Sequence, residues 1–130
     1  MLIEAAELKR GMCVIVEGFP CVVVDSSRVK YGKGPVFVHA ELRDVLSDVP
    51  RKAAFHLMKR LEQRELVVRW MRYHQSIDGS HVFSDSGTGE QVTVPNEFIG
   101  NDAQWLKEDH LWKLVYLDGE LFAALPMFRS

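Results

Sequence analysis

The segment that decides the fold is VKYGKGPVFV, residues 29–38. It lies between two runs, 22–30 and 35–43, that read as β-strands because they are rich in Val and bounded by turn residues. A glycine stands on each side of Lys33, so the chain can turn sharply there without a neighbouring side chain covering the lysine. If four residues of each arm project beyond the sheet, the tip stands out by about 13 Å at the usual strand rise. The sequence predicts a β-hairpin with an exposed lysine at its tip.

A second hairpin is predicted just upstream, with Glu17 and Gly18 at the centre of a two-residue turn. In that register Cys13 faces Val22 and Cys21 faces Val14, so the two thiols point to opposite faces of the sheet. A shift of one residue would reverse this arrangement. We therefore expect two small buried hydrophobic residues rather than a disulfide.

The second half also alternates short strands with turns. Strands are expected at 66–73, 81–83, 91–94, 111–116 and 120–125, and short helical turns at 95–100 and 103–106. Five strands with a helix between the third and the fourth is the order of an OB-fold. The charge balance changes near Gln63, because residues 1–63 hold 10 Lys+Arg and 8 Asp+Glu whereas 64–130 hold 6 and 10. We expect one domain at 1–63 and a second at 64–130.

The stretch 50–66 is ambiguous. Ala54, Leu57, Met58 and Leu61 fall at helical spacing, and the local composition also favours a helix. Taken alone, this stretch predicts a helix.

The composition excludes several classes of protein. With 47% hydrophobic and 26% charged residues, the 130-residue chain is typical of a soluble globular protein and not of a disordered one. No run of 18 apolar residues occurs, and an acid at position 4 replaces the basic start of a signal peptide, so we expect a cytoplasmic protein without a membrane span. The net charge of −2 lacks the basic surplus of a non-specific nucleic-acid binder. Any RNA contact is expected to be local and in the first half.

No pattern of an enzyme is found. The segment Gly32-Lys33-Gly34 is not a phosphate-binding P-loop, because the spaced upstream glycine and the following Ser or Thr are missing. The five histidines are scattered, and no two of them sit at metal-ligand spacing with a Cys or acid partner. Thiols inside apolar strands are inert. We expect no catalytic residue, no metal and no cofactor.

The aromatic residues of the second half and Lys33 each have a structural explanation that competes with a functional one. OB-folds can stack bases on surface aromatics, and the second half offers Trp70, Tyr73, Phe83, Trp112, Tyr116 and Phe122. These residues lie in Val- and Leu-rich strands of an acidic half, where packing in the core is the default. Lys33, taken alone, is a solvated turn lysine. The order of the segments around it changes that interpretation.

That order resembles the first two domains of bacterial elongation factor P. The similar segments are ELKRGM (7–12), EGFPCVV (17–23), VKYGKGPVFV (29–38), ELR (41–43), EQV (90–92), WLKE (105–108) and YLDGE (116–120). No single motif is decisive, but the series is specific and covers nearly the whole chain. The resemblance implies an all-β protein, with an SH3-like (KOW-type) barrel followed by an OB-fold barrel with short helices. It also implies strands at about 51–56 and 65–75, which we adopt in place of the helix.

The resemblance further implies a cytoplasmic translation factor that binds the ribosome between the peptidyl and exit tRNA sites and relieves stalls at consecutive prolines. In that family the tip lysine reaches toward the CCA end of the peptidyl-tRNA and is often extended by a post-translational modification. The implied partners are ribosomal RNA, peptidyl-tRNA and a lysine-modifying enzyme, with no membrane. The residues expected to form the binding tip are Arg28, Lys30, Tyr31, Gly32, Lys33 and Gly34, with Lys33 as the modified residue.

Two features depart from the family pattern. Tyr31 stands where the family usually has proline, so we expect a less rigid loop. Bacterial members also carry a third domain, a second OB-fold. The resemblance leaves open whether such a domain exists in the natural protein or whether this is a two-domain relative resembling the hypusine-containing initiation factor of eukaryotes and archaea. The alternative function is an RNA- or protein-binding module of the same fold outside the tRNA channel, for which Lys33→Ala would be silent.

Overall fold

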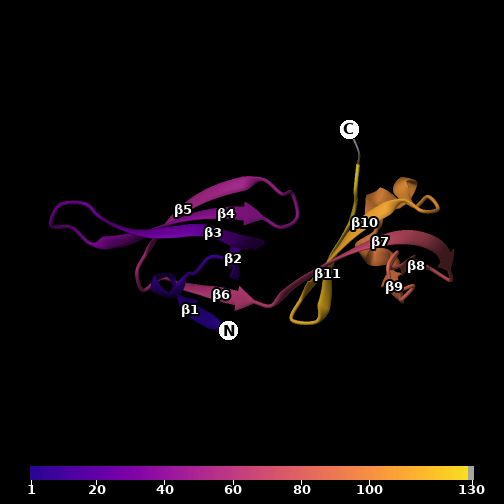
Figure 1. Ribbon diagram of the computed structural model, residues 1–130, viewed down its shortest axis with the longest axis horizontal. Helices are drawn as coiled ribbons and strands as arrows, with labels where there is room; N and C mark the ends of the chain where they lie inside the picture. Colours follow the sequence, from indigo (N-terminus) through magenta and orange to yellow (C-terminus); the bar gives the residue numbers. More distant parts are fainter. Residues whose placement is uncertain (129–130) are drawn as a thin grey trace. The chain divides into compact units, whose positions relative to one another are not determined.

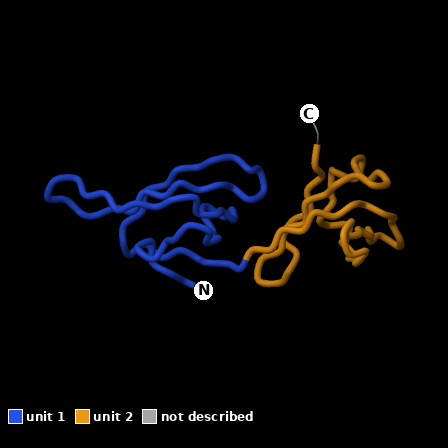
Figure 2. Tube along the Cα trace, viewed as in Figure 1, with its two compact units in different colours: residues 1–65 blue, residues 66–130 orange. Residues whose placement is uncertain are grey.

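The computed structural model describes residues 1–128, and the chain divides into two compact units, Met1–Glu65 and Leu66–Ser130 (Figure 2). Each unit contains one antiparallel sheet and its own apolar core. The all-β prediction is confirmed. The division falls two residues after the expected one at 63.

The first unit is a six-stranded sheet with the strand order β1-β6-β2-β3-β4-β5 (Figure 1). Its elements are β1 (Leu2–Glu4), the 3-10 helix η1 (Ala5–Glu7), β2 (Cys13–Val16), β3 (Phe19–Lys30), β4 (Val36–Asp44), β5 (Pro50–His56) and β6 (Arg60–Arg64). Alternation along β4 buries Val38, Ala40 and Leu42 against the core and leaves the residues between them more exposed. The same strand therefore has one face on the core and one open face.

The hairpin of β2 and β3 has the predicted register. Glu17 and Gly18 have φ values of 52° and 84°, and positive φ at both central residues is the mark of a type I′ turn. Cys13 pairs with Val22 and Cys21 with Val14. Burial raises the pKa of the Cys21 thiol, and the nearby negative charge of Asp44 adds to this rise. The thiol is therefore kept protonated and unreactive.

The ambiguous stretch forms strands: β5 and the later strand β7 (Leu66–Ile77) confirm the strands adopted at about 51–56 and 65–75, and the helix that the spacing alone favours is wrong. Ala53 and Phe55 pack against the core, whereas Ala54 is exposed and Met58 is 75% exposed. The buried residues thus follow a period of two, because β5 pairs with β4 along its whole length. Strand β6 was not expected at all. It pairs with both β1 and β2 although only Leu61 in it is buried.

The second unit has five strands in the order β11-β10-β7-β8-β9. Its elements are β7 (Leu66–Ile77), β8 (Ser80–Ser84), β9 (Gln91–Pro95), the 3-10 helices η2 (Asn96–Phe98) and η3 (Gly100–Trp105), β10 (Leu111–Leu117) and β11 (Glu120–Pro126). The predicted order, with helical turns between the third and fourth strands, is confirmed. Its core includes Met71, Phe83, Trp112 and Leu114. Along residues 1–128, no helix has the length and hydrophobicity that crossing a membrane requires.

Candidate functional site

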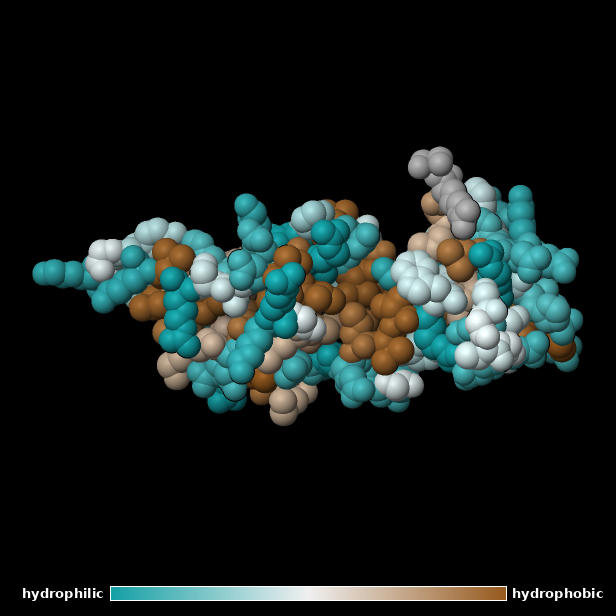
Figure 3. All heavy atoms as spheres, viewed as in Figure 1, coloured by the Kyte–Doolittle hydropathy of each residue, from teal (hydrophilic) through white to brown (hydrophobic). Residues whose placement is uncertain are grey.

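The predicted lysine hairpin is formed by β3 and β4. Their last paired residues are Lys30 and Val36, and a five-residue loop, 31–35, joins them. The partner strands stop short of the tip, since β2 pairs with β3 only as far as Val22 and β5 ends opposite Phe37. The hairpin consequently protrudes from the rest of its unit (Figure 1), and its protruding end is hydrophilic (Figure 3).

A tight turn holds Lys33 at the tip. The Gly34 N–H donates to the Tyr31 carbonyl oxygen at 3.0 Å, which closes the turn 31–34. Gly32 has a φ of +59°, whereas Lys33 does not have a positive φ, and this combination is the pattern of a type II′ turn. A Cβ atom at Gly34 would lie 3.1 Å from the Tyr31 carbonyl oxygen, so the second glycine is also favoured. Lys33 is exposed and makes no hydrogen bond or ion pair with any residue in 1–128.

Tyr31 joins the turn to the body of the hairpin. Its hydroxyl lies 3.3 Å from Nε2 of His39, and the two ring centroids are 6.0 Å apart. His39 was not among the residues predicted to form the tip. Strand alternation could have placed it, because His39 pairs with Ser27 on the same face of the hairpin as Tyr31.

Arg28 and Lys30 lie on the opposite face of β3 from Tyr31, since strand residues alternate. Both are exposed, and the Arg28 guanidinium donates to the Ala6 carbonyl oxygen at 3.4 Å, tying the hairpin to η1. Between residues 26 and 40 the chain carries three basic residues and no acidic one. The six predicted tip residues thus lie together at the acid-free end of the hairpin, residues 26–40, with Arg28 and Lys30 on one face and Lys33 at the tip.

The aromatic residues of the second unit divide into two groups. Phe83 and Trp112 are fully buried, and Tyr73 and Tyr116 pack against the same core. Only Trp70, at 51%, and Phe122, at 40%, are substantially exposed among the six residues weighed as a stacking surface. Burial also raises the pKa of Tyr116. Core packing is therefore the main role of this set.

Charged groups in the second unit pair with one another. The Arg69 guanidinium donates to both carboxylate oxygens of Glu90, at 2.9 and 3.3 Å, and lies 3.8 Å from the Asp85 carboxylate. Backbone N–H groups of Gly87 and Thr88 hold the pKa of Asp85 below its ordinary value. Within the described part of the chain, no group of three or more His, Cys, Asp or Glu side chains could hold a metal ion.

Comparison with solved structures supports the fold. Eukaryotic translation initiation factor 5A from Methanococcus jannaschii has a TM-score of 0.53 at 19% identity, and the match covers 98% of this chain and 94% of that one. A translation initiation factor eif-5a family protein from Naegleria fowleri has a TM-score of 0.58 at 13% identity, covering 96% and 97%. At these identities the likeness concerns the fold alone.

Comparison of sequences identifies the family. The model described as the elongation factor P (EF-P) KOW-like domain matches residues 4–56, and that of the EF-P OB domain matches 68–124, which confirms the predicted order of folds. Elongation factor P of Corynebacterium urealyticum is 34% identical over 122 residues, which cover 93% of this chain and 65% of the relative. That of Helicobacter hepaticus is 29% identical over 106 residues, covering 82% and 57%. The chain thus spans somewhat less than two thirds of the length of these relatives. With both domain models matched in order and relatives of the same name along nearly its whole length, the chain belongs to the elongation factor P family.

Proposed function

We propose that this protein is a cytoplasmic translation factor that binds the ribosome beside the peptidyl-tRNA and promotes peptide-bond formation at consecutive prolines through Lys33. Its relatives are translation factors by name, which supports the general role. The observation that carries the specific role is the placement of Lys33. It is exposed at the second central position of a glycine-framed turn, at the end of a protruding hairpin.

For the proposed promotion of peptide-bond formation, the protein has to supply a positive charge at a defined position and no catalytic acid or base. The peptidyl-transferase centre is built of RNA, so a factor that works there need not supply an acid or a base. Holding the end of the tRNA in a reactive geometry lowers the barrier by the proximity effect. A lysine ammonium is a compact point charge on a flexible stem, which suits a phosphate-lined channel.

The same features make Lys33 accessible to a lysine-modifying enzyme. Its amine is unengaged by residues 1–128, and glycines on both sides leave room for the active site of another enzyme. Modification would lengthen the side chain and extend its reach beyond the hairpin. We therefore propose ribosomal RNA, peptidyl-tRNA and such an enzyme as the partners, with no membrane involved.

The test is the rate of synthesis of a peptide with three consecutive prolines in a reconstituted translation system. The wild-type protein is expected to accelerate synthesis, and Lys33→Ala to return the rate to that without factor. Lys59→Ala is the matched control, because Lys59 is an exposed turn lysine of the same unit between β5 and β6. Lys33→Arg separates the two roles of the lysine, since arginine keeps the charge but is no substrate for lysine modification.

Ribosome pelleting completes the test. A protein that pellets with ribosomes and accelerates synthesis only with Lys33 intact supports the proposal. If the protein neither pellets nor accelerates, the alternative of a binding module outside the tRNA channel is favoured, and Lys33→Ala should then be silent in every assay. Mass spectrometry of protein purified from its own cells would report whether Lys33 is modified.

A further inference from the structure

Both edges of the six-stranded sheet open onto one groove in the first unit. The edge strands are β1 and β5. The groove has a volume of about 750 Å³, and its lining includes Leu2 of β1, residues 52–55 of β5 and residues 60–62 of β6. This volume lies within the range of ligand-binding clefts, about 300–1,000 Å³. The role proposed for the hairpin tip does not use the groove.

Backbone groups along these two edges are open to a further strand. The gap is bridged where the chain leaves the two strands, since the Ala5 N–H donates to the Lys59 carbonyl oxygen at 2.8 Å and the Ala6 N–H donates to the Leu57 carbonyl oxygen at 3.0 Å. Among residues 1–128, no strand pairs with the outer side of β1 or of β5. An extended chain from another molecule can therefore add to the sheet here by main-chain hydrogen bonds.

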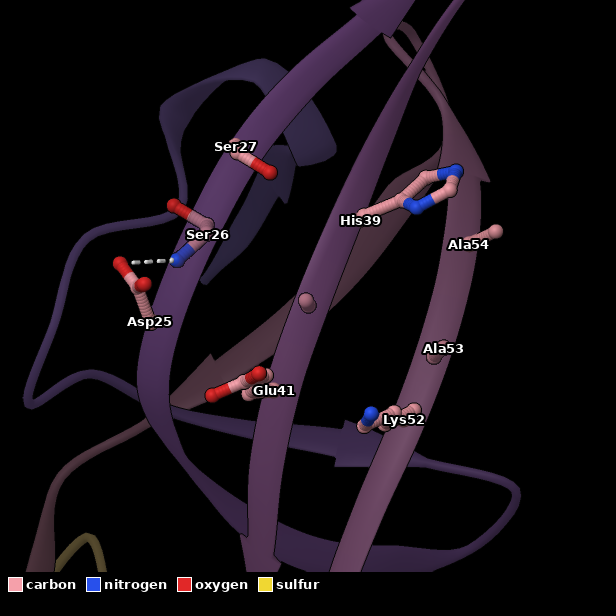
Figure 4. Close-up of a pocket in the computed structure, with 9 residues that line it drawn as sticks. Asp25, Ser26, Ser27, His39, Glu41, Lys52, Ala53 and Ala54 are labelled. Carbon is pink, nitrogen blue, oxygen red and sulfur yellow. Dashed lines mark hydrogen bonds between the residues drawn. The ribbon is translucent and has the colours of Figure 1, made fainter.

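Side chains along β5 alternate between the core and the open face of the sheet. Ala53 and Phe55 pack against the core of the first unit, whereas Lys52 and Ala54 are exposed on the open face (Figure 4). Phe55 also lines the groove, together with the half-buried Ile15 of β2. A strand added beside β5 has the same alternation, so every second side chain of it points into the groove. Those side chains meet apolar atoms, which favours apolar residues at these positions.

The charges around the groove favour acidic residues at the other positions of the added strand. Lys52 on β5 and Arg60 on β6 are exposed at the groove, and their side chains form no hydrogen bond or ion pair with any residue in 1–128. Of the acids in the lining, Glu62 is already paired with Arg64 at 3.2 Å, which leaves Glu17. Opposite charges that face each other across neighbouring strands stabilise their pairing.

A second copy of this chain fits the edge of β5 less well than an acidic segment does. The strand, Pro50–His56, contains Arg51 and Lys52 and no acid. Pairing of this edge with the same edge of another copy would bring two cationic strands together, and like charges across strands are destabilising. A lysine on an edge strand is one of the devices by which proteins prevent such self-pairing. The same lysine attracts a segment of opposite charge.

From these observations we infer that the groove between β1 and β5 binds an extended segment of a partner protein in which apolar and acidic residues alternate. The segment pairs with the free edge of β5. Its apolar side chains fill the groove beside Ile15 and Phe55, and its acidic side chains lie next to Lys52 and Arg60. This protein-binding site is separate from the hairpin tip and does not depend on the role proposed for Lys33.

The test is binding of the fluorescein-labelled hexapeptide EVEVEV to the whole protein, followed by fluorescence anisotropy at physiological salt. EVEVEV is expected to bind at least tenfold more tightly than EEEVVV, which has the same composition but cannot place its apolar and acidic side chains on two faces of a strand. Lys52→Glu should weaken the binding of EVEVEV about tenfold and strengthen that of KVKVKV, because it reverses one charge beside the bound strand.

Lys9→Glu is the matched control, because Lys9 is an exposed lysine of the same unit outside the groove lining. At physiological salt exposed charges act over about 8 Å, so this variant should bind EVEVEV as the wild type does. Lys33→Ala should also bind it unchanged. Amide chemical shifts of the free proteins establish that each variant is folded.

Hydrogen exchange followed by NMR gives a second readout. Saturating EVEVEV should slow the exchange of amides within residues 51–55, as new main-chain hydrogen bonds at that edge require. Equal binding of EVEVEV and EEEVVV, binding unaffected by Lys52→Glu, unchanged exchange along β5, or no binding overturns the inference. A dimer in sedimentation equilibrium that Lys52→Glu alters would assign the edge to a second copy and overturn it as well. Each of these failures leaves the proposed function standing, because synthesis of the triproline peptide does not use the groove.

Discussion

Replacing Gly32 with alanine strains the turn that carries Lys33 without touching any packed atom. Gly32 has a φ of +59°, and a Cβ atom built there meets nothing within 4 Å. The substitution therefore acts only through the backbone. An L-residue with a Cβ atom costs about 1–2 kcal/mol in the left-handed region, which is a factor of roughly 5–30 in the population of the native turn at 25 °C.

This strain should reduce activity in the triproline assay and leave the stability of the first unit unchanged. The turn is exposed and contributes nothing to the core of its unit, so the loop can relax to another conformation while the sheet stays folded. In the triproline assay we expect Gly32→Ala to need roughly 5–30 times more protein for half-maximal acceleration. The thermal unfolding temperature should be unchanged.

Gly32→Asn is the informative control. Asparagine adopts positive φ more readily than alanine, and its side chain has the same open space at this position. We expect its dose–response to lie close to that of wild type. If Gly32→Ala instead matches both wild type and Gly32→Asn, the turn geometry does not set the position of Lys33 and the reasoning is refuted.

Two further predictions concern the two cores and their charges. Asp44→Ala should destabilise the first unit by about 3 kcal/mol, because it removes the 2%-exposed carboxylate that lies 3.0 Å from the Arg51 guanidinium. Hydrogen exchange of core amides would measure this loss, and a value below about 1 kcal/mol would contradict it. Asp85, whose pKa is lowered from 3.8 by the N–H groups of Gly87 and Thr88, stabilises the second unit above that value. This contribution is lost as pH falls through the lower pKa of the folded state, so Asp85→Asn should weaken the dependence of stability on pH below about 4 in urea unfolding followed by tryptophan fluorescence. An unchanged pH profile would count against it.

Hairpins closed by two-residue turns could be predicted from the sequence alone. Glu17-Gly18, Asp78-Gly79 and Asp118-Gly119 all have positive φ at both positions. Such turns match the twist of the flanking strands and fix which residues pair. Once the turn at Glu17 is recognised, the register of Cys13 and Cys21 follows without any knowledge of the rest of the fold.

The stretch 50–64 shows where this reasoning fails. β5 is an edge strand with one face on the core and one in solvent, and two of its exposed positions, Lys52 and Ala54, carry good helix formers. β6, with the sequence RLEQR, lies between two strands of the sheet although one residue of it is buried. Its place depends on pairing with β1 and β2, which are distant in sequence. Local preference is weak where tertiary pairing decides.

The candidate site was predictable only in part for a similar reason. Gly-Lys-Gly between two strands is a local signal, and it locates Lys33 correctly at a hairpin tip. The contact of Tyr31 with His39 depends on the register of β3 and β4. Only the register shows that these residues share one open face, so sequence reasoning left His39 out.

The construction of the hairpin explains how a small loop can be placed accurately. β3 and β4 are continuous strands that carry core residues such as Val23 and Ala40 at one end and the tip at the other. The connecting loop is limited to residues 31–35, so the packed core fixes the direction of the two strands, and the turn has only to orient Lys33. Substitutions in the turn should therefore change activity without changing stability, whereas substitutions at Val38 or Ala40 should change both. A site built on rigid strands is held more precisely than one on a long loop, and positioning is the whole task proposed for Lys33.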